Sequence, residues 1–325
     1  MATKKAAHLS PRYGIAEWYG TDIRALSPAR RKEFAKVSLQ GGPRDVPPCP
    51  FLGAVLPGAL CNKAGGVCST RSYKKTAVRF AIPTNDPVAT LCPMRFLEDA
   101  SILRWVGEVI LGTRSPWLVK EVPFLEKLGT AAADDEKNAH KAGRIDWVLV
   151  NPTSKSLPWC ALETQAVYFS GDSMASEFKA YETADDQRPL FPIGKRRPDY
   201  RSSGPKRLAP QLQVKVPTLG NWGRKIAVVV DRYFYENMSA LAEVEIRGGD
   251  EQDKLDNSEV IWFVVDYDSK SSKFIHVKHI FSKLNESVSA LNATQPISKK
   301  QFEKELKALL DDQSKLGSKV FKLGK

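Results

Sequence analysis

Two carboxylates and an amide lie inside apolar runs in the middle of the chain, where they could hold a metal ion. Asp146 lies in Arg-Ile-Asp-Trp-Val-Leu-Val, and Glu163 and Gln165 lie in Leu-Glu-Thr-Gln-Ala-Val. A carboxylate in such a run costs free energy unless a partner compensates it. Side chains alternate along a strand, so Glu163 and Gln165 share a face on which Asp146 from a paired strand could meet them. Carboxylate oxygens suit Mg²⁺. The alternative is a pair of edge-strand acids that face water.

Four of the five cysteines lie in one short stretch of the chain, which predicts a second metal site. They are Cys49, Cys61, Cys68 and Cys92. Proline follows Cys49 and Cys92, and Gly65 and Gly66 shortly precede Cys68, so the loops could bend until four thiolates converge on zinc or iron. Their spacing is not that of paired C-x2-C knuckles. One alternative is that several are buried small hydrophobes. Disulfides are a third, which we do not expect because the N-terminal Met-Ala-Thr-Lys-Lys lacks the apolar region of a secretory signal.

The surplus of basic residues favours a polyanionic partner. Lysine and arginine total 49 against 37 acidic residues, a net charge of +12. Seven of these basic residues lie in 194–215 with one acidic residue, among prolines, glycines and serines. We expect an irregular basic arm there that follows a phosphate backbone. The alternative is a solvated surface loop. Arginine and lysine also gather just after Cys68, where a metal-bound loop could present them to phosphates or to guanine edges.

The pattern of apolar residues predicts the elements that must position these groups. We expect helices over 27–39 and 95–111, the second amphipathic, and a short helix or loop over 130–142. Five short runs rich in branched and aromatic residues predict strands at 145–150, 161–169, 225–234, 260–267 and 274–277. A helix with an apolar stripe follows Ser298. The order predicts an α/β core with a mixed sheet. We divide the chain into an N-terminal helical and loop region with the cysteines, 1–111, and a core with the basic arm and the C-terminal helix, 112–325.

Several short motifs occur together in the order of one known family. They are Ile15-Ala-Glu-Trp-Tyr-Gly, Cys49-Pro-Phe-Leu, Cys61 with Lys63, Gly66-Val-Cys, Cys92-Pro with Arg95, Asp146-Trp, Leu162-Glu-Thr-Gln with Phe169 and Gly171, and Ser258-Glu with Trp262. By these motifs the chain resembles the NotI-type type II restriction endonucleases, which pair a four-cysteine iron site with a PD-(D/E)xK nuclease core. An acid on one strand, a hairpin, and acid-x-polar on the next strand is the skeleton of that core.

The resemblance implies roles for the residues that match. Asp146 and Glu163 would bind a catalytic Mg²⁺, and Gln165 would be catalytic at the position where most such nucleases have lysine. Cys49, Cys61, Cys68 and Cys92 would hold one structural iron, although four thiolates would equally suit zinc. Water activated by the metal would attack the phosphodiester in line. The DNA contacts that we predict are Arg71, Lys74, Lys75, Arg95, Lys195, Arg196, Arg197 and Arg201.

The resemblance also implies partners and a setting. We expect a homodimer that cleaves double-stranded DNA at a long, GC-rich palindrome, in the bacterial cytoplasm, beside a cognate DNA methyltransferase encoded elsewhere. No apolar run approaches the length of a membrane span. Two other functions fit the residues, a metal-stapled DNA-binding protein that does not cut, and a repair nuclease of the same core that recognises DNA structure. Cleavage at one repeated sequence would distinguish the restriction enzyme from both.

Overall fold

The computed structural model describes residues 11–40, 46–75, 80–126, 141–293 and 297–321. The chain divides into two compact units, Met1–Asn292 and Ala293–Lys325. Most of the segment expected at 130–142 lies outside the described residues. None of the described helices is long and apolar enough to cross a membrane.

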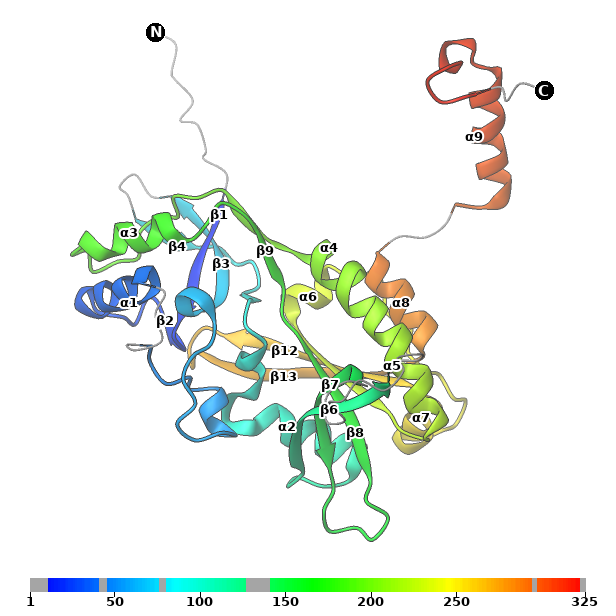
Figure 1. Ribbon diagram of the computed structural model, residues 1–325, viewed down its shortest axis with the longest axis horizontal. Coiled ribbons are helices and arrows are strands. Elements are labelled where there is room, and N and C mark those ends of the chain that lie inside the picture. Colours follow the sequence, from blue (N-terminus) through cyan, green and yellow to red (C-terminus); the bar gives the residue numbers. More distant parts are fainter. Residues whose placement is uncertain (1–10, 41–45, 76–79, 127–140, 294–296, 322–325) are drawn as a thin grey trace, which may run out of the picture. The chain divides into compact units, whose positions relative to one another are not determined.

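A six-stranded sheet forms the centre of the first unit, in the order β13-β12-β11-β8-β7-β6 (Figure 1). β11 runs parallel to both of its neighbours, β8 and β12, and the other pairs are antiparallel. The expectation of an α/β fold with a mixed sheet is therefore confirmed. The strands are β6 (Trp117–Glu126), β7 (Lys141–Val150), β8 (Trp159–Gln165), β11 (Ile226–Asp231), β12 (Val260–Asp268) and β13 (Lys273–Ser282).

Successive side chains of β11 enter two different apolar clusters, one on each face of this sheet. Val228 packs with Leu212 and Val216 of helix α5 (Ala209–Asn221). Val229, the next residue, packs with residues of helix α2 (Ser101–Leu111). Strands buried on both faces by helices are typical of parallel strands in α/β proteins. On the first face α5 lies beside α8 (Leu284–Asn292) (Figure 1).

A second sheet lies in the N-terminal region, where we expected only helices and loops. It pairs β2 (Thr21–Asp22), β1 (Arg12–Trp18), β3 (Val67–Lys75) and β4 (Ala81–Pro83), with β5 (Ala89–Thr90) also on β3. β3 escaped prediction because its middle residues are polar and nevertheless buried. Hydrogen bonds to other buried groups compensate them; the Thr70 hydroxyl, for example, donates to the Gly14 carbonyl at 2.6 Å.

Shorter elements complete the first unit, and two of them, Tyr168–Gly171 and Arg196–Asp199, pair as a third, two-stranded sheet. Helix α1 (Pro28–Gln40) confirms the helix expected at 27–39, and packs against α3 (Ala175–Thr183). The expected helix over 95–111 is a 3₁₀ segment, η4 (Pro93–Ala100), followed by α2. The others are η2 (Leu52–Ala54), η3 (Ala64–Gly66), β9 (Tyr168–Gly171), β10 (Arg196–Asp199), α6 (Arg232–Glu236) and α7 (Glu251–Asn257).

The basic arm expected at 194–215 is wrong, because this stretch is mostly helical. After β10 come α4 (Tyr200–Ser203), a π-helical turn η5 (Gly204–Leu208) and α5. The side chain of Asp199 caps the start by accepting a hydrogen bond from the Ser202 N–H at 3.0 Å. Two of the prolines that suggested a loop lie in the first turns of η5 and α5, where proline is tolerated.

Asp231 at the end of β11 connects the two sheets. Its carboxylate accepts the N–H of Thr90 in β5 at 2.5 Å and the N–H of Phe234 in α6 at 2.7 Å. Only 1% of the residue is exposed. Burial raises the pKa of Asp231 to about 6, against the lowering effect of its hydrogen bonds.

This raised pKa predicts how stability depends on pH. The folded protein binds the proton of Asp231 more tightly than the unfolded chain, so protonation favours folding. We expect wild type to gain about 2.5 kcal/mol of unfolding free energy relative to Asp231→Asn between about pH 7 and pH 4. Urea unfolding of both proteins across this pH range measures the difference in their unfolding free energies. A difference between the two proteins that does not change with pH would contradict the raised pKa.

The second unit contains the expected C-terminal helix, α9 (Lys299–Asp311), and a 3₁₀ turn, η6 (Gln313–Lys315). The Ser298 side chain caps α9 by accepting the Gln301 N–H at 3.2 Å. No residue of the helix is buried, and its apolar stripe of Phe302, Leu306 and Leu310 is exposed.

Candidate active site

Strands β7 and β8 bring the two predicted acids opposite one another. Their antiparallel register pairs Val148 with Ala161 and Trp147 with Leu162, and the next residue on each strand is Asp146 and Glu163. Val148 and Ala161 enter the cluster that includes α5. Because side chains alternate, Asp146, Glu163 and Gln165 all belong to that same face of the sheet.

Asp146 and Gln165 line a cleft of about 720 Å³. Asp146 is exposed and Gln165 is partly exposed. The Gln165 amide nitrogen donates a hydrogen bond to the Ala166 carbonyl at 2.5 Å. Thr164 lies between the acid and the amide of β8 and lines the same cleft. The cleft therefore offers a carboxylate and a neutral amide to a ligand.

Glu163 is buried beside this cleft and has a cation as its partner. Only 3% of the residue is exposed, and its Oε1 accepts a hydrogen bond from the ammonium of Lys215 on α5, itself 6% exposed. The pKa of Glu163 is raised, first by burial and to a lesser extent by the Asp146 carboxylate, while Lys215 lowers it. The sequence suggested Lys215 only as one cation of the basic arm, and this pairing was missed.

Further residues on the walls of the cleft were missed as site residues. The guanidinium of Arg207 in η5 lies 3.6 Å from the centre of the Tyr168 ring. Gln211 of α5 and Lys63 also line the cleft, and Lys63 donates to the Leu91 carbonyl at 2.8 Å. The sequence places Arg207 and Gln211 one turn apart, but that relation becomes visible only once the segment is known to be helical.

The four clustered cysteines lie in one neighbourhood. Cys49 and Cys68 are buried in one small cluster that Cys61 packs against, and all are free thiols. The backbone holds Cys92 close, since its N–H donates to the Cys68 carbonyl at 3.1 Å. Burial raises the pKa of the Cys61, Cys68 and Cys92 thiols, and thiols of the same group add to each shift.

Backbone donors point at the sulfurs. The Gly20 N–H donates to Cys68 Sγ at 3.3 Å, and the Leu52 N–H donates to Cys49 Sγ at 3.4 Å. Such donors orient and stabilise thiolate ligands, so the donor set fits a bound metal. Across the described ranges, however, no three His, Cys, Asp or Glu side chains converge closely enough to form a metal site. The structure therefore gathers the thiols without closing them around one point.

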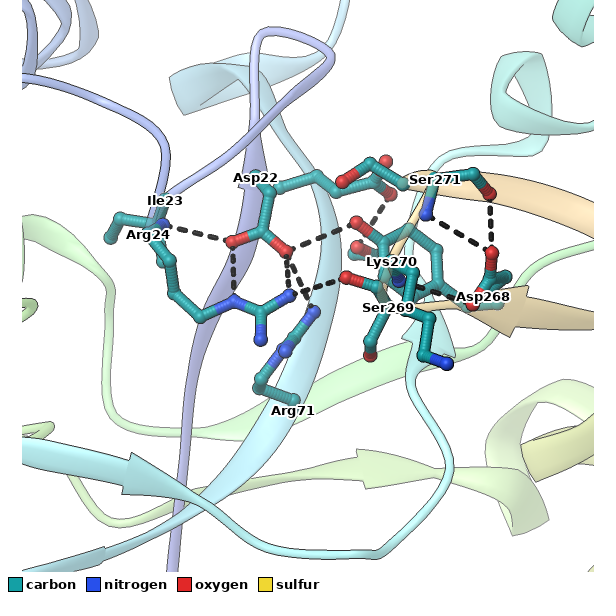
Figure 2. A network of polar contacts seen from close by, with 12 residues as sticks. Asp22, Ile23, Arg24, Arg71, Asp268, Ser269, Lys270 and Ser271 are labelled. Atoms are coloured by element: carbon teal, nitrogen blue, oxygen red, sulfur yellow. Dashed lines mark hydrogen bonds and ion pairs between the residues drawn. The ribbon is translucent and has the colours of Figure 1, made fainter.

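Three of the arginines predicted to contact DNA are buried in ion pairs instead. Arg71 donates to Asp22 Oδ2 at 3.1 Å, in a network that also includes Arg24 and the turn at Ser269 (Figure 2). The exposed fraction of Arg71 is 3%. A guanidinium held this way cannot reach a base edge or a phosphate, so its predicted role is corrected.

The same correction applies to Arg95 and Arg196. Arg95 is fully buried, and its guanidinium lies 3.0 Å from Glu17 and 2.8 Å from Glu98. Arg196 is 6% exposed and pairs with Glu177 at 2.5 Å. Runs of arginine in a sequence do not distinguish a solvated guanidinium from one that pairs inside the protein.

The other five predicted contacts are exposed: Lys74, Lys75, Lys195, Arg197 and Arg201. Lys195 and Arg197 line a second hollow of about 610 Å³ together with Arg12, which the sequence did not single out. Arg12 lies at the start of β1 and donates to the Ile193 carbonyl at 2.7 Å. This hollow, which we call the basic hollow, places these three cationic side chains beside the ion-paired Arg196, which also lines it.

Comparison with known families now identifies the chain. The model of the restriction endonuclease NotI family matches residues 40–275, well over half of the chain. The chain belongs to the NotI restriction endonuclease family. A comparison with curated proteins finds no match. The matched range includes both candidate acids, Gln165 and all four clustered cysteines.

Membership in the NotI family gives the general activity. The chain is a type II site-specific restriction endonuclease that acts on double-stranded DNA. Restriction endonucleases generally use Mg²⁺. Asp146 in the cleft and the buried Glu163 opposite it, on adjacent strands of a mixed sheet, have the carboxylate oxygens that this ion prefers.

Proposed function

We propose that the cleft at Asp146 is the nuclease site of a PD-(D/E)xK core and that it cleaves DNA phosphodiester bonds. The observation that carries this proposal is the meeting of Asp146 and Glu163 across the β7–β8 pair, beside Gln165. Asp146 and Glu163 would hold the Mg²⁺. When bound, this ion would lower the pKa of a water molecule and neutralise charge on the scissile phosphate.

The protein's own residues have separate tasks in this reaction. Asp146, exposed in the cleft, fixes one side of the ion site, and the buried Glu163 fixes the other. Gln165 has a neutral amide, so it orients a ligand by hydrogen bonding without supplying charge. Arg207, stacked on Tyr168 at the cleft wall, is placed to bind the phosphate backbone.

Cleavage of a large, fully sequenced DNA, long enough to contain several copies of a rare site, tests the reaction. With Mg²⁺ we expect discrete fragments, and with EDTA we expect none, because the carboxylates alone cannot activate water. Cleavage at the same rate in EDTA would remove the metal from the proposal. DNA binding without cleavage in Mg²⁺ or Mn²⁺ would favour a binding protein that does not cut.

For DNA binding we propose the exposed residues Lys74, Lys75, Lys195, Arg197 and Arg201, with Arg12 added from the basic hollow. Each phosphate that such a residue neutralises releases counterions, so affinity falls as salt rises. Charge here sets affinity, and base contacts elsewhere would set the recognised sequence.

Charge reversal in the basic hollow is expected to weaken DNA binding. The double variant Lys195→Glu/Arg197→Glu should reduce the slope of log affinity against log salt by about 2, since two phosphate contacts are lost. Fluorescence anisotropy with a DNA duplex between low and physiological salt measures the slope. The matched control is Lys299→Glu/Lys300→Glu in α9, which reverses two exposed lysines of the second unit. An unchanged slope in the basic-hollow variant would mean that the hollow does not contact DNA.

We also propose that Cys49, Cys61, Cys68 and Cys92 bind one structural iron or zinc. The support is their shared neighbourhood, their free thiols and the N–H donors at Cys49 and Cys68. In this proposal residues 1–111 form the cysteine-bearing part and residues 112–325 the nuclease core. Binding would draw the thiolates together from the arrangement described above and would contribute to folding.

The remaining expectations follow from family membership rather than from a contact in the structure. We propose that the enzyme acts as a homodimer on a long, GC-rich palindrome, since a two-fold site matches a two-fold enzyme. A cognate methyltransferase would protect the host DNA. Analytical ultracentrifugation with and without DNA tests the dimer.

A further inference from the structure

The proposed nuclease site lacks a cation at the position where this type of core has its lysine. Position 165 holds glutamine, whose amide is neutral and already donates to the Ala166 carbonyl at 2.5 Å. Electrostatic stabilisation of a phosphoryl-transfer transition state needs positive charge close to the carboxylates. If the chemistry is the same, a residue other than Gln165 must supply the charge that lysine adds to that of the Mg²⁺.

Lys215 occupies a position that a helix of this pattern would give to an apolar residue. It belongs to the buried stripe of α5 with Leu212, Val216 and Leu219. Lysine is almost never buried without a specific partner. When one residue breaks the local pattern of an otherwise regular helix, the usual reason is function.

The surroundings of Lys215 connect it to the cleft. Its ammonium donates to the Glu163 carboxylate, and Gln211, one turn earlier on α5, lines the cleft that contains Asp146. The π-helical turn η5 lies immediately before α5 and carries Arg207, another cleft residue. Single π-helical turns inside α-helices are frequent at functional sites. The face of the η5–α5 segment that meets β8 is thus a wall of the site.

We propose that Lys215 supplies from α5 the positive charge that position 165 lacks on β8. This inference rests on the proposed function, because it gives Lys215 a role only if Glu163 belongs to the nuclease site. Lys215 is a positioning residue that acts through Glu163: it holds the buried carboxylate in place and keeps a cation next to the carboxylate pair. In this proposal the site requires a lysine charge next to Glu163. That charge comes from helix α5 in this chain, instead of from strand β8.

Moving the lysine from position 215 to position 165 tests this proposal directly. Single-turnover DNA cleavage is compared for wild type, Lys215→Met, Lys215→Arg and the double variant Gln165→Lys/Lys215→Met. We expect Lys215→Met to cleave on the order of 100-fold more slowly, as when one electrostatic group is removed from a transition state. Lys215→Arg should stay within about tenfold of wild type, and the double variant should recover at least about tenfold over Lys215→Met. Lys254→Met, on α7, is the matched control.

A second measurement needs no activity and no metal. In EDTA, Lys215→Met should lower the thermal unfolding midpoint because Glu163 is left buried without its partner. Glu163→Gln/Lys215→Met should recover part of that loss, since the unpaired charge is gone. If the decrease in unfolding midpoint of the double variant instead equals the sum of the decreases of Glu163→Gln and Lys215→Met, the pair does not exist in solution and the inference fails. Should Lys215→Met not fold at all, Lys215→Arg and Gln165→Lys/Lys215→Met decide the outcome.

The outcomes separate this inference from the proposed function. If Lys215→Met cleaves within about threefold of wild type while Asp146→Asn is inactive, the nuclease site stands and the role of Lys215 is wrong. The role is also wrong if Lys215→Met is folded and inactive while Lys215→Arg and Gln165→Lys/Lys215→Met are equally inactive. If Asp146→Asn and Glu163→Gln both cleave like wild type, the site itself is wrong, and the inference falls with it.

Discussion

Asp146→Asn is expected to reduce DNA cleavage by on the order of 1,000-fold or more while DNA binding stays intact. Asparagine has nearly the shape of aspartate but lacks the charge that would hold Mg²⁺ opposite Glu163. Asp146 is exposed in the cleft, so losing its charge should cost little stability. Removing a negative charge from a surface that meets phosphates should, if anything, strengthen DNA binding.

Three measurements make this prediction specific. Cleavage rates under single-turnover conditions report the loss, anisotropy reports DNA binding, and thermal unfolding reports the fold. Asp256→Asn, an exposed aspartate of α7, is the control for the loss of one negative charge. If Asp146→Asn cleaves at the rate of Asp256→Asn, the cleft at Asp146 is not the nuclease site.

Cys68→Ser is expected to have the largest effect on stability. A structural metal contributes its binding free energy to folding, and serine is a poor ligand for iron or zinc. We expect the variant to lose bound metal and at least about 3 kcal/mol of unfolding free energy. Cys68 also accepts the Gly20 N–H, which ties β3 to the turn after β1, so serine there would loosen the N-terminal sheet as well.

Elemental analysis and urea unfolding of purified protein check this prediction. The matched control is Cys160→Ser, because Cys160 is a fully buried cysteine of β8 that lies apart from the other four. Cys160→Ser should keep the full metal content and lose only the smaller free energy of burying a hydroxyl. If wild type contains no metal and has the same unfolding free energy as Cys68→Ser, the four cysteines are packing residues and not metal ligands.

All strands of the central sheet except β6, together with the two acids, were predictable from the sequence for a simple reason. β7, β11 and β12 are short runs of branched and aromatic side chains, and burial selects such residues in central strands. An acid inside such a run is costly, so Asp146 and Glu163 stand out among the acidic residues of the chain. Because β7 and β8 form a hairpin, the antiparallel register of the two strands determines that Asp146 and Glu163 lie opposite one another.

The N-terminal sheet and the helical character of residues 200–221 were not predictable in the same way. The buried residues of β3 include Ser69, Thr70 and Arg71, whose partners come from distant parts of the chain. Polar residues satisfied by long-range hydrogen bonds leave no periodic signal in the sequence. Prolines around 194–215 indicated a loop, yet two of them lie in first turns of helices, which their spacing did not reveal.

Lys215 shows how a charge count can mislead about a site. By its place in the sequence it was one cation of the predicted basic arm, but in the fold it pairs with Glu163, one of the two predicted acids. The signal was present in the apolar spacing of Leu208, Leu212, Val216 and Leu219, which places residue 215 on the buried side of a helix. Charge and helical periodicity, taken together, would have predicted that Lys215 is a buried cation that needs an acidic partner.

Mapping of DNA ends tests most directly whether this chain cuts DNA at one sequence with the site at Asp146. Wild type and Asp146→Asn are each incubated with a large, fully sequenced DNA in Mg²⁺, and all new ends are sequenced. We predict discrete ends at one repeated sequence with wild type, and none with Asp146→Asn. Ends scattered without a shared sequence, or the same ends from both proteins, would contradict this function for the cleft.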